Sequence, residues 1–435
     1  MTNVTAPRRP TSEGPDRPTY GGAMAFVSTL DDLPRAALER VALEYMLTGM
    51  LLNRGMLPQV ILHGGSADDM DQVAIDLWMG ASPNYTRRLR DLMGIDGDDV
   101  VAIFKALQLD VGFVHQYMDV EYTVHDAAHA EFRLLHCGAL LDAEPHGEDR
   151  VFGMCHTIED PTFDATALAH NPRARIRPIH RPPRQPANRH PHCHWTLTID
   201  PANDPVGPAR LTETVGALPL ADVANTIGLR TDDGLVDYRG PFVPALRLSA
   251  FSHSALAALA REFQMQTQLL AVAGELALNR YFAPPDAHAM TVRAWWSSGW
   301  IMSERLTQAL HLTPDSTGMA QLLALHPAIP DGFHRDITID ADTVTMRLHT
   351  DVPGLFDVGH PGVPGIVADD DPLPWARLVQ GLDRGATADV DLGPDGLTVR
   401  ITVGADPVAA ELPEPDEVVF MRIGSVAGWA FSATA

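Results

Sequence analysis

The spacing of hydrophobic residues changes along the chain from a helical pattern to a strand pattern. Within residues 33–109, apolar side chains such as Leu38, Val41, Ala42 and Tyr45 recur at intervals of three and four positions, as on one face of an amphipathic helix. Residues 117–124, 130–135 and 195–199 instead alternate between apolar and polar, which is typical of strands. The pattern predicts several helices followed by antiparallel strands.

The second half of the chain repeats this order. Residues 249–281 and 294–309 have helical spacing, and residues 336–340 and 344–348 alternate. A shift of 217 positions, the separation of Trp78 and Trp295, also aligns Val120 with Ile337. We therefore expect an α+β fold in two related halves, each with helical segments followed by antiparallel strands. The alternative is that any two segments of helices followed by a hairpin match at a few positions.

These patterns predict four regions along the chain. Residues 1–23 are polar and proline-rich, without the apolar stretch of a secretory signal, and are expected to form a disordered leader. Residues 24–200 are expected to form a metal-binding α+β domain, and residues 201–244 a connector. Residues 245–435, which contain no cysteine, are expected to form a second α+β domain without metal ligands.

Composition limits the classes of partner. The net charge of −24 argues against nucleic acid or an anionic membrane, because both bind clustered positive charge. No segment reaches the roughly 20 apolar residues of a membrane helix. The three cysteines are an odd number in histidine-rich surroundings, so a disulfide framework is not expected and a cytoplasmic location fits best. The expected partner is a small-molecule substrate, and a homodimer is compatible with the sequence. Arginine greatly outnumbers lysine, which indicates a GC-rich genome of actinobacterial type.

The cysteines and histidines cluster in one segment. Cys137, Cys155 and Cys193 are the three cysteines of the chain, and eleven of its nineteen histidines lie between His115 and His194. Thiolate sulfur and imidazole nitrogen are ligands of zinc, iron and copper. The cluster predicts a bound metal. The alternative is that the cysteines are three buried free thiols.

A closed zinc site needs a fourth ligand. His192 and His194 flank Cys193, and neighbouring residues on a strand point to opposite faces, so these two histidines seldom share a metal with it. His190 precedes them. We expect His180 to lie on a proline-rich loop within residues 142–189, where that restriction does not apply. The predicted ligands are Cys137, Cys155, His180 and Cys193.

A family resemblance supports the same segment. It is carried by five short motifs: Cys137, Gly153-Met154-Cys155, Asn171-Pro172-Arg173, His180-Arg181-Pro182-Pro183-Arg184 and Cys193-His194-Trp195. These resemble a bacterial family related to L-2-amino-thiazoline-4-carboxylic acid hydrolase. The resemblance implies a helical first part followed by four spaced cysteines, the third before Pro-Pro and the last shortly before Trp. Here His180 stands in place of one cysteine, which implies a Cys3His site.

Other polar groups near the predicted ligands suit catalysis. His156 and Glu159 are the candidate proton-transfer residues. Arg181 and Arg184 are candidates for binding an anionic substrate, although arginines in an acidic protein also pair with its own carboxylates. The expected cofactor is zinc, and the alternative is an iron–sulfur cluster with partial histidine ligation.

The sequence leaves more than one function open. The first hypothesis is a metal-containing enzyme that acts on a small, anionic substrate by hydrolysis or hydration. One alternative is a non-catalytic binding or assembly protein with a closed structural zinc site, because four ligands fill a tetrahedron. The other is an iron–sulfur protein with a redox or lyase role.

Overall fold

The computed structural model describes residues 26–231, 233–331, 333, 335–349, 371–393 and 396–422. The leader expected at residues 1–23 lies outside the described residues. The remaining predicted regions fall wholly or partly within them.

The first half contains long helices, then a hairpin, then short helices and a second hairpin. Its elements are α1 (Arg35–Leu62), α2 (Ala67–Met93), α3 (Val100–Leu107), β1 (Met118–Val124), β2 (His129–Cys137), α4 (Gly138–Ala143), α5 (Glu148–Phe152), the π-helical turn η3 (Gly153–Ile158), α6 (Glu159–Leu168), β3 (Ala174–His180), β4 (Cys193–Ile199) and α7 (Arg210–Gly216). Single-turn 3-10 helices occur at Leu30–Asp32, Glu144–His146, Pro219–Asp222 and Leu248–Ala250.

The second half repeats the long helices and the two hairpins. Its elements are α8 (His253–Leu278), α9 (Pro284–Leu310), α10 (Ser316–Leu325), β5 (Arg335–Asp340), β6 (Thr343–His349), α12 (Leu373–Val379), β7 (Thr387–Gly393), β8 (Gly396–Thr402), α13 (Pro407–Glu411) and α14 (Asp416–Arg422). Helices α2 and α9 begin and end 217 positions apart, as the sequence alignment of the two halves predicts.

The two sheets share one topology. The strand order is β1-β2-β4-β3 in the first half and β5-β6-β8-β7 in the second, and every neighbouring pair is antiparallel. In the first sheet, Phe132 of β2 lies between Tyr122 of β1 and Trp195 of β4, so three large side chains share one face. The predicted α+β fold, with helices followed by strands in two similar halves, is confirmed.

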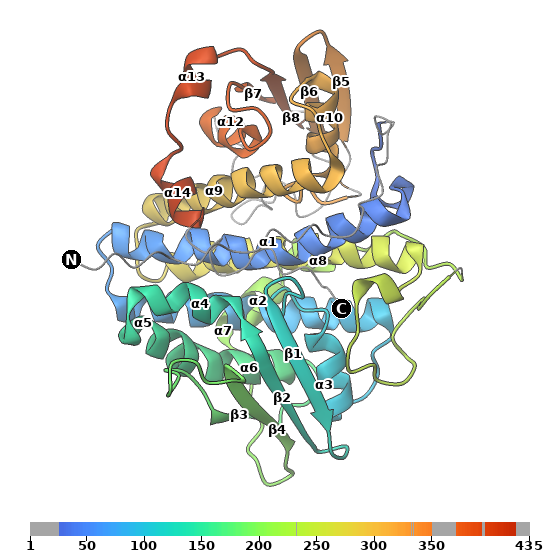
Figure 1. Ribbon diagram of the computed structural model, residues 1–435, viewed down its shortest axis with the longest axis vertical. Helices are drawn as coiled ribbons and strands as arrows, with labels where there is room; N and C mark the ends of the chain where they lie inside the picture. The colour runs from blue at the N-terminus through green and yellow to red at the C-terminus, as the bar shows by residue number, and fades with distance from the viewer. Residues whose placement is uncertain are drawn as a thin grey trace, which may run out of the picture.

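The long helices of the two halves interlock. Helix α1 packs against both α8 and α9, and α2 packs against α8. Figure 1 shows these helices across the middle of the molecule, with the two sheets at opposite ends. One hydrophobic core joins residues of both halves, including Tyr45 and Phe263. A separate cluster around Phe132 and Trp195 lies between the first sheet and the helices that pack on it. The sheets are therefore carried on a shared helical centre.

Local sequence explains where helix α2 begins and ends. The side chain of Ser66 accepts a hydrogen bond from the backbone N–H of Asp69 at 3.1 Å, and the Asp69 carboxylate accepts one from the Ser66 N–H at 2.8 Å, which is a capping box. Gly94 ends the helix in the left-handed conformation. The helix continues through Pro83, which is buried. Packing of α2 on α8 outweighs the hydrogen bond that proline removes.

The segment 142–189 is the main departure from the predicted secondary structure. It was expected to be a long irregular loop, but it contains η3, α6 and β3 as well as two short helices. These elements are too short to show a clear periodic hydrophobic pattern, and tertiary contacts hold them in place. The turn η3 and helix α6 pack on α2, while β3 packs on α6 and pairs with β4. His180 is consequently the last residue of β3, paired with His194 of β4, and is not on a loop.

Among the residues that the structure describes, no helix combines the length and the apolar character needed to cross a bilayer.

Candidate functional site

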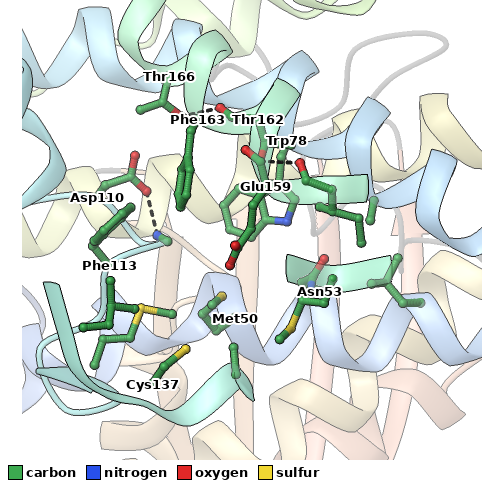
Figure 2. A pocket seen from close by; sticks show the side chains of 18 of the residues that line it. Met50, Asn53, Trp78, Asp110, Phe113, Cys137, Glu159, Thr162, Phe163 and Thr166 are labelled. Carbon is green, nitrogen blue, oxygen red and sulfur yellow. Dashed lines mark hydrogen bonds between the residues drawn. The ribbon is translucent and has the colours of Figure 1, made fainter. Parts of the chain in front are cut away.

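A cavity of about 140 Å³ lies inside the first half. Helices α1, α2 and α6 surround it, together with the turn after α3 and strands β1 and β2 (Figure 2). The side chains that define it most clearly are Met50, Asn53, Trp78, Tyr85, Asp110, Phe113, Cys137, Arg150, Met154, Glu159, Phe163 and Thr166. The described residues that line it all belong to the first half.

Aromatic and sulfur-containing side chains form most of the wall. Figure 2 shows Trp78, Phe113 and Phe163 around the cavity, with Met50 below them. The ring of Phe163 meets the ring of Trp195 edge-on at 4.9 Å between centroids and lies 5.9 Å from that of Phe113. Because these rings belong to the core of the first sheet, the wall is held in shape by packing.

Glu159 has a carboxyl group that points into this largely apolar space. It is the first residue of α6, directly after η3, and its carboxyl is directed toward the middle of the cavity (Figure 2). Its Oε2 atom is buried and has no hydrogen-bond partner among the described residues. Burial raises the pKa of the Glu159 carboxyl to about 8, although nearby Arg181 acts in the opposite direction. The carboxyl therefore carries its proton at neutral pH.

Asp110 is a second carboxyl on the wall, and its surroundings differ. Its Oδ1 accepts hydrogen bonds from the Tyr85 hydroxyl at 3.0 Å and from the Gly112 backbone N–H at 2.6 Å. Burial raises the pKa of Asp110 to about 6, and the two hydrogen bonds limit the rise. Asp110 is therefore held in place by its own chain, whereas Glu159 is available to a ligand.

Asn53 and Arg150 also bring polar groups to the cavity wall. Asn53 of α1 has a buried Oδ1 atom without a partner among the described residues. Arg150 of α5 is engaged, since its guanidinium donates to Asp71 at 3.3 Å. The buried, unpartnered polar atoms of the described wall are thus the oxygens of Asn53 and Glu159.

The predicted metal centre is wrong. Within the described ranges, no group of three or more histidine, cysteine, aspartate or glutamate side chains is arranged to hold a metal ion. This overturns the hypothesis of a metal-containing enzyme with a Cys3His site at Cys137, Cys155, His180 and Cys193. It also removes the alternatives of a closed structural zinc site and an iron–sulfur centre. Clustering along the sequence did not translate into a coordinating arrangement of the side chains.

The cysteines instead contribute to the core of the first half. All three are buried free thiols that belong to the apolar cluster around Phe132 and Trp195. Burial raises the pKa of Cys137 to about 12 and also raises the pKa of Cys155 and of Cys193. They are therefore protonated thiols of the core at neutral pH.

Three other predicted site residues lie outside the cavity wall. The Nε2 atom of His156 lies 2.7 Å from the carbonyl oxygen of Pro182, and its ring stacks on Phe152. The two candidate substrate-binding arginines form ion pairs within the chain. Arg181 pairs with Asp160 at 2.6 Å, and Arg184 makes two hydrogen bonds of 2.8 Å to Glu144. Of the predicted catalytic and substrate-binding residues, Glu159 is the one that lines the cavity.

Sequence reasoning missed the wall residues of α1, of α2 and of the turn after α3. Met50 and Trp78 lie on the apolar faces of long helices, where such residues usually form ordinary core. Asp110 carried a usable signal, because it interrupts the apolar run Leu109-Asp110-Val111. A carboxylate within such a run is expected to be buried with a specific partner.

Comparison of this chain with models of protein families, with curated proteins and with solved structures finds no match. The resemblance to relatives of L-2-amino-thiazoline-4-carboxylic acid hydrolase stays a prediction from short motifs. The cavity is therefore the feature of the chain that indicates a function.

Proposed function

We propose that the first half binds a small, largely apolar molecule in this cavity, with Glu159 as its polar anchor. One observation carries the proposal: a buried carboxyl oxygen without a partner in the described structure points into a largely apolar space. Pockets for small molecules commonly combine apolar walls with a few converging polar groups.

The energetic cost of this arrangement supports a ligand. A buried polar group without a hydrogen bond costs about 1–3 kcal/mol of stability. Leucine or methionine at position 159 would avoid that cost and would fill part of the cavity. A ligand that hydrogen-bonds to the carboxyl offsets the cost and restores packing of the wall. The Glu159 carboxyl is therefore better explained as a binding group than as a packing defect.

The cavity volume limits the size of the ligand. An engineered apolar cavity of roughly 150 Å³ in another protein holds benzene, and the cavity here is about 140 Å³. The ligand should therefore be close in size to one six-membered ring with a short polar substituent. Trp78, Phe113 and Phe163 provide ring faces and edges for such a molecule.

The same carboxyl favours catalysis as a second candidate function. A general acid or base works best when its pKa is close to the working pH, and burial brings the pKa of Glu159 to about 8. In this role, Glu159 would exchange a proton with the bound molecule. Glu159→Gln would then abolish turnover while leaving binding of the neutral part of the substrate intact.

Filling the cavity tests the binding proposal. Ala74 lines the cavity and is 1% exposed, so Ala74→Leu places three further carbon atoms at its wall. We expect this variant to lose heat of binding for benzyl alcohol, a neutral one-ring probe, while the parent chain binds it. The matched control is Ala410→Leu, at an exposed position of α13.

Two measurements decide the outcome. Isothermal titration calorimetry gives the affinity for benzyl alcohol, and urea unfolding shows that each variant is folded. Equal binding by the parent, Ala74→Leu and Ala410→Leu would place the probe elsewhere, and absence of binding by the parent would contradict the proposal.

A further inference from the structure

The geometry points to a ligand with a positive charge: a primary ammonium group attached to a single apolar or aromatic ring. This inference rests on the proposed function, because it names the chemical class of molecule that the same cavity binds. It replaces the anionic substrate that the sequence suggested.

The hydrogen-bonding groups of the wall favour a donor. The buried, unpartnered polar atoms of the described wall are oxygens, Oε2 of Glu159 and Oδ1 of Asn53, which come from different helices. An ammonium group has three N–H donors and no acceptor, so it suits this pair of oxygens. A carboxylate or phosphate has acceptors alone, so it could pair with Glu159 only through the proton of that carboxyl and would leave Oδ1 of Asn53 without a partner.

The charges on the wall also favour a cation. Two carboxyls, Asp110 and Glu159, line the cavity, while the guanidinium of Arg150 is engaged by Asp71. Arg181 and Arg184, which the sequence analysis assigned to an anionic substrate, pair with carboxylates of the chain and do not line the cavity. An anion would meet two acidic groups, and the cationic side chain of the described wall, Arg150, already pairs with Asp71.

The aromatic rings of the wall and the negative charge of the whole chain also favour a cationic ligand. Trp78, Phe113 and Phe163 surround the space into which Glu159 points (Figure 2). The negative face of an aromatic ring attracts a cation, most strongly where water is excluded. The net charge of −24 adds a long-range field that draws cations toward the protein.

Binding of an ammonium ion requires Glu159 to release its proton. The protonated carboxyl and the free ammonium ion give a carboxylate–ammonium pair and one proton in solution, so charge and atoms balance. Several titratable groups influence the Glu159 carboxyl. Arg181 favours its charged form, Asp160 opposes it, and the neighbouring thiols of Cys137, Cys155 and Cys193 are protonated. Affinity should therefore rise with pH until Glu159 is ionised.

Three ring compounds of similar size show how the charge of the ligand, at nearly constant shape, affects its affinity. Benzylamine is the cationic probe, benzyl alcohol the neutral probe and benzoate the anionic probe, each titrated into the full chain by calorimetry. We expect benzylamine to bind most tightly, with affinity rising on the order of tenfold per pH unit between pH 6 and 7.5. Titration in two buffers of different ionisation enthalpy should show release of close to one proton, and benzoate should not bind.

Glu159→Gln removes the charge with little change of shape. We expect it to weaken benzylamine binding at pH 8 by tenfold or more, and to abolish both the pH dependence and the proton release. Binding of benzyl alcohol should persist. Glu148→Gln is the matched control, since Glu148 is exposed on α5, and it should behave as the parent chain does.

The outcomes distinguish this inference from the proposed function. If benzyl alcohol binds as tightly as benzylamine at both pH values, or if benzoate binds more tightly, the ligand is not cationic and the cavity is still a binding site. If none of the three compounds binds, both proposals fail. Loss of benzylamine binding in Glu148→Gln would also overturn the role of Glu159.

Discussion

The two halves of the molecule share an element order and a sheet topology, yet they differ in the short helix that packs on a long helix of each half. In the first half, α6 packs on α2 and directs Glu159 into a cavity. In the second half, α12 packs on α9 and carries Trp375, which is fully buried. The short helix that packs on a long helix in each half thus carries a carboxyl directed into a cavity in the first half and a buried tryptophan in the second.

Glycine permits the tight contact in the second half. A Cβ atom at Gly381, just after α12, would collide with the backbone oxygen of Trp300 in α9. The Ser303 hydroxyl of α9 also donates to the Leu378 carbonyl of α12 at 2.6 Å. The close approach of α12 to α9 therefore depends on a missing side chain as well as on the bulk of Trp375.

The largest expected effect comes from emptying the core of the second half. Trp375→Ala should lower the free energy of unfolding by about 3–5 kcal/mol, because a fully buried ring is removed. Phe163→Ala in the first half should cost less, since its partly buried ring already borders the cavity. Urea unfolding of both variants measures the difference. Equal costs would mean that the two halves are packed alike.

The second prediction concerns pH and the first half. The pKa of Glu159 is about 8 in the folded protein and about 4.3 in an unfolded chain. Its contribution to stability is therefore complete below pH 4 and is lost as the pH rises to 8, by up to roughly 1.4 kcal/mol per pH unit. Glu159→Gln should gain stability relative to the parent as the pH rises.

This difference is measured as the gap between the urea midpoints of the parent and Glu159→Gln at pH 5 and pH 8. Glu148→Gln is the control, and its gap should stay constant. A constant gap for Glu159→Gln as well would show that the Glu159 carboxyl titrates as it does in water.

A third prediction compares one glycine contact in each half. Gly381→Ala should destabilise by about 1–3 kcal/mol, because the added Cβ meets backbone that cannot move independently. Gly153→Ala should cost less, because the added Cβ meets the Asp71 carboxylate, a side chain that can rotate. Thermal melting of the two variants gives the order. A larger effect at Gly153 would indicate that the Asp71–Arg150 pair is rigid.

The smallest expected effect is at a predicted metal ligand. Cys137 caps α4, with its sulfur accepting a hydrogen bond from the Leu140 N–H at 3.4 Å. Serine is a good N-cap, so Cys137→Ser should change stability by less than about 1 kcal/mol. Treatment with a chelator should leave the melting temperature of the parent and the variant unchanged. A marked drop in the melting temperature after chelation would indicate that the protein does hold a structural metal.

Local sequence signals account for the parts of the fold that were predicted correctly. The apolar spacing that predicts α1 also forms its buried face, and the alternation around Tyr122 appears in β1 as expected. Helical and strand periodicities arise from the backbone geometry of neighbouring residues, so they can be read without knowing the fold. The 217-residue shift likewise aligned α2 with α9 because both are long and regular.

The sequence by itself determined the class of fold, the order of its elements and Glu159 as a candidate site residue. Tertiary structure decided that His180 lies on a strand, that the three cysteines are core thiols and that Met50, Trp78 and Glu159 share one cavity. These outcomes depend on how α1, α2 and α6 pack, and residues far apart in the chain meet through contacts that local periodicity does not encode. Spacing along a chain sets the number of bonds between two sulfur atoms, whereas packing sets the distance between them.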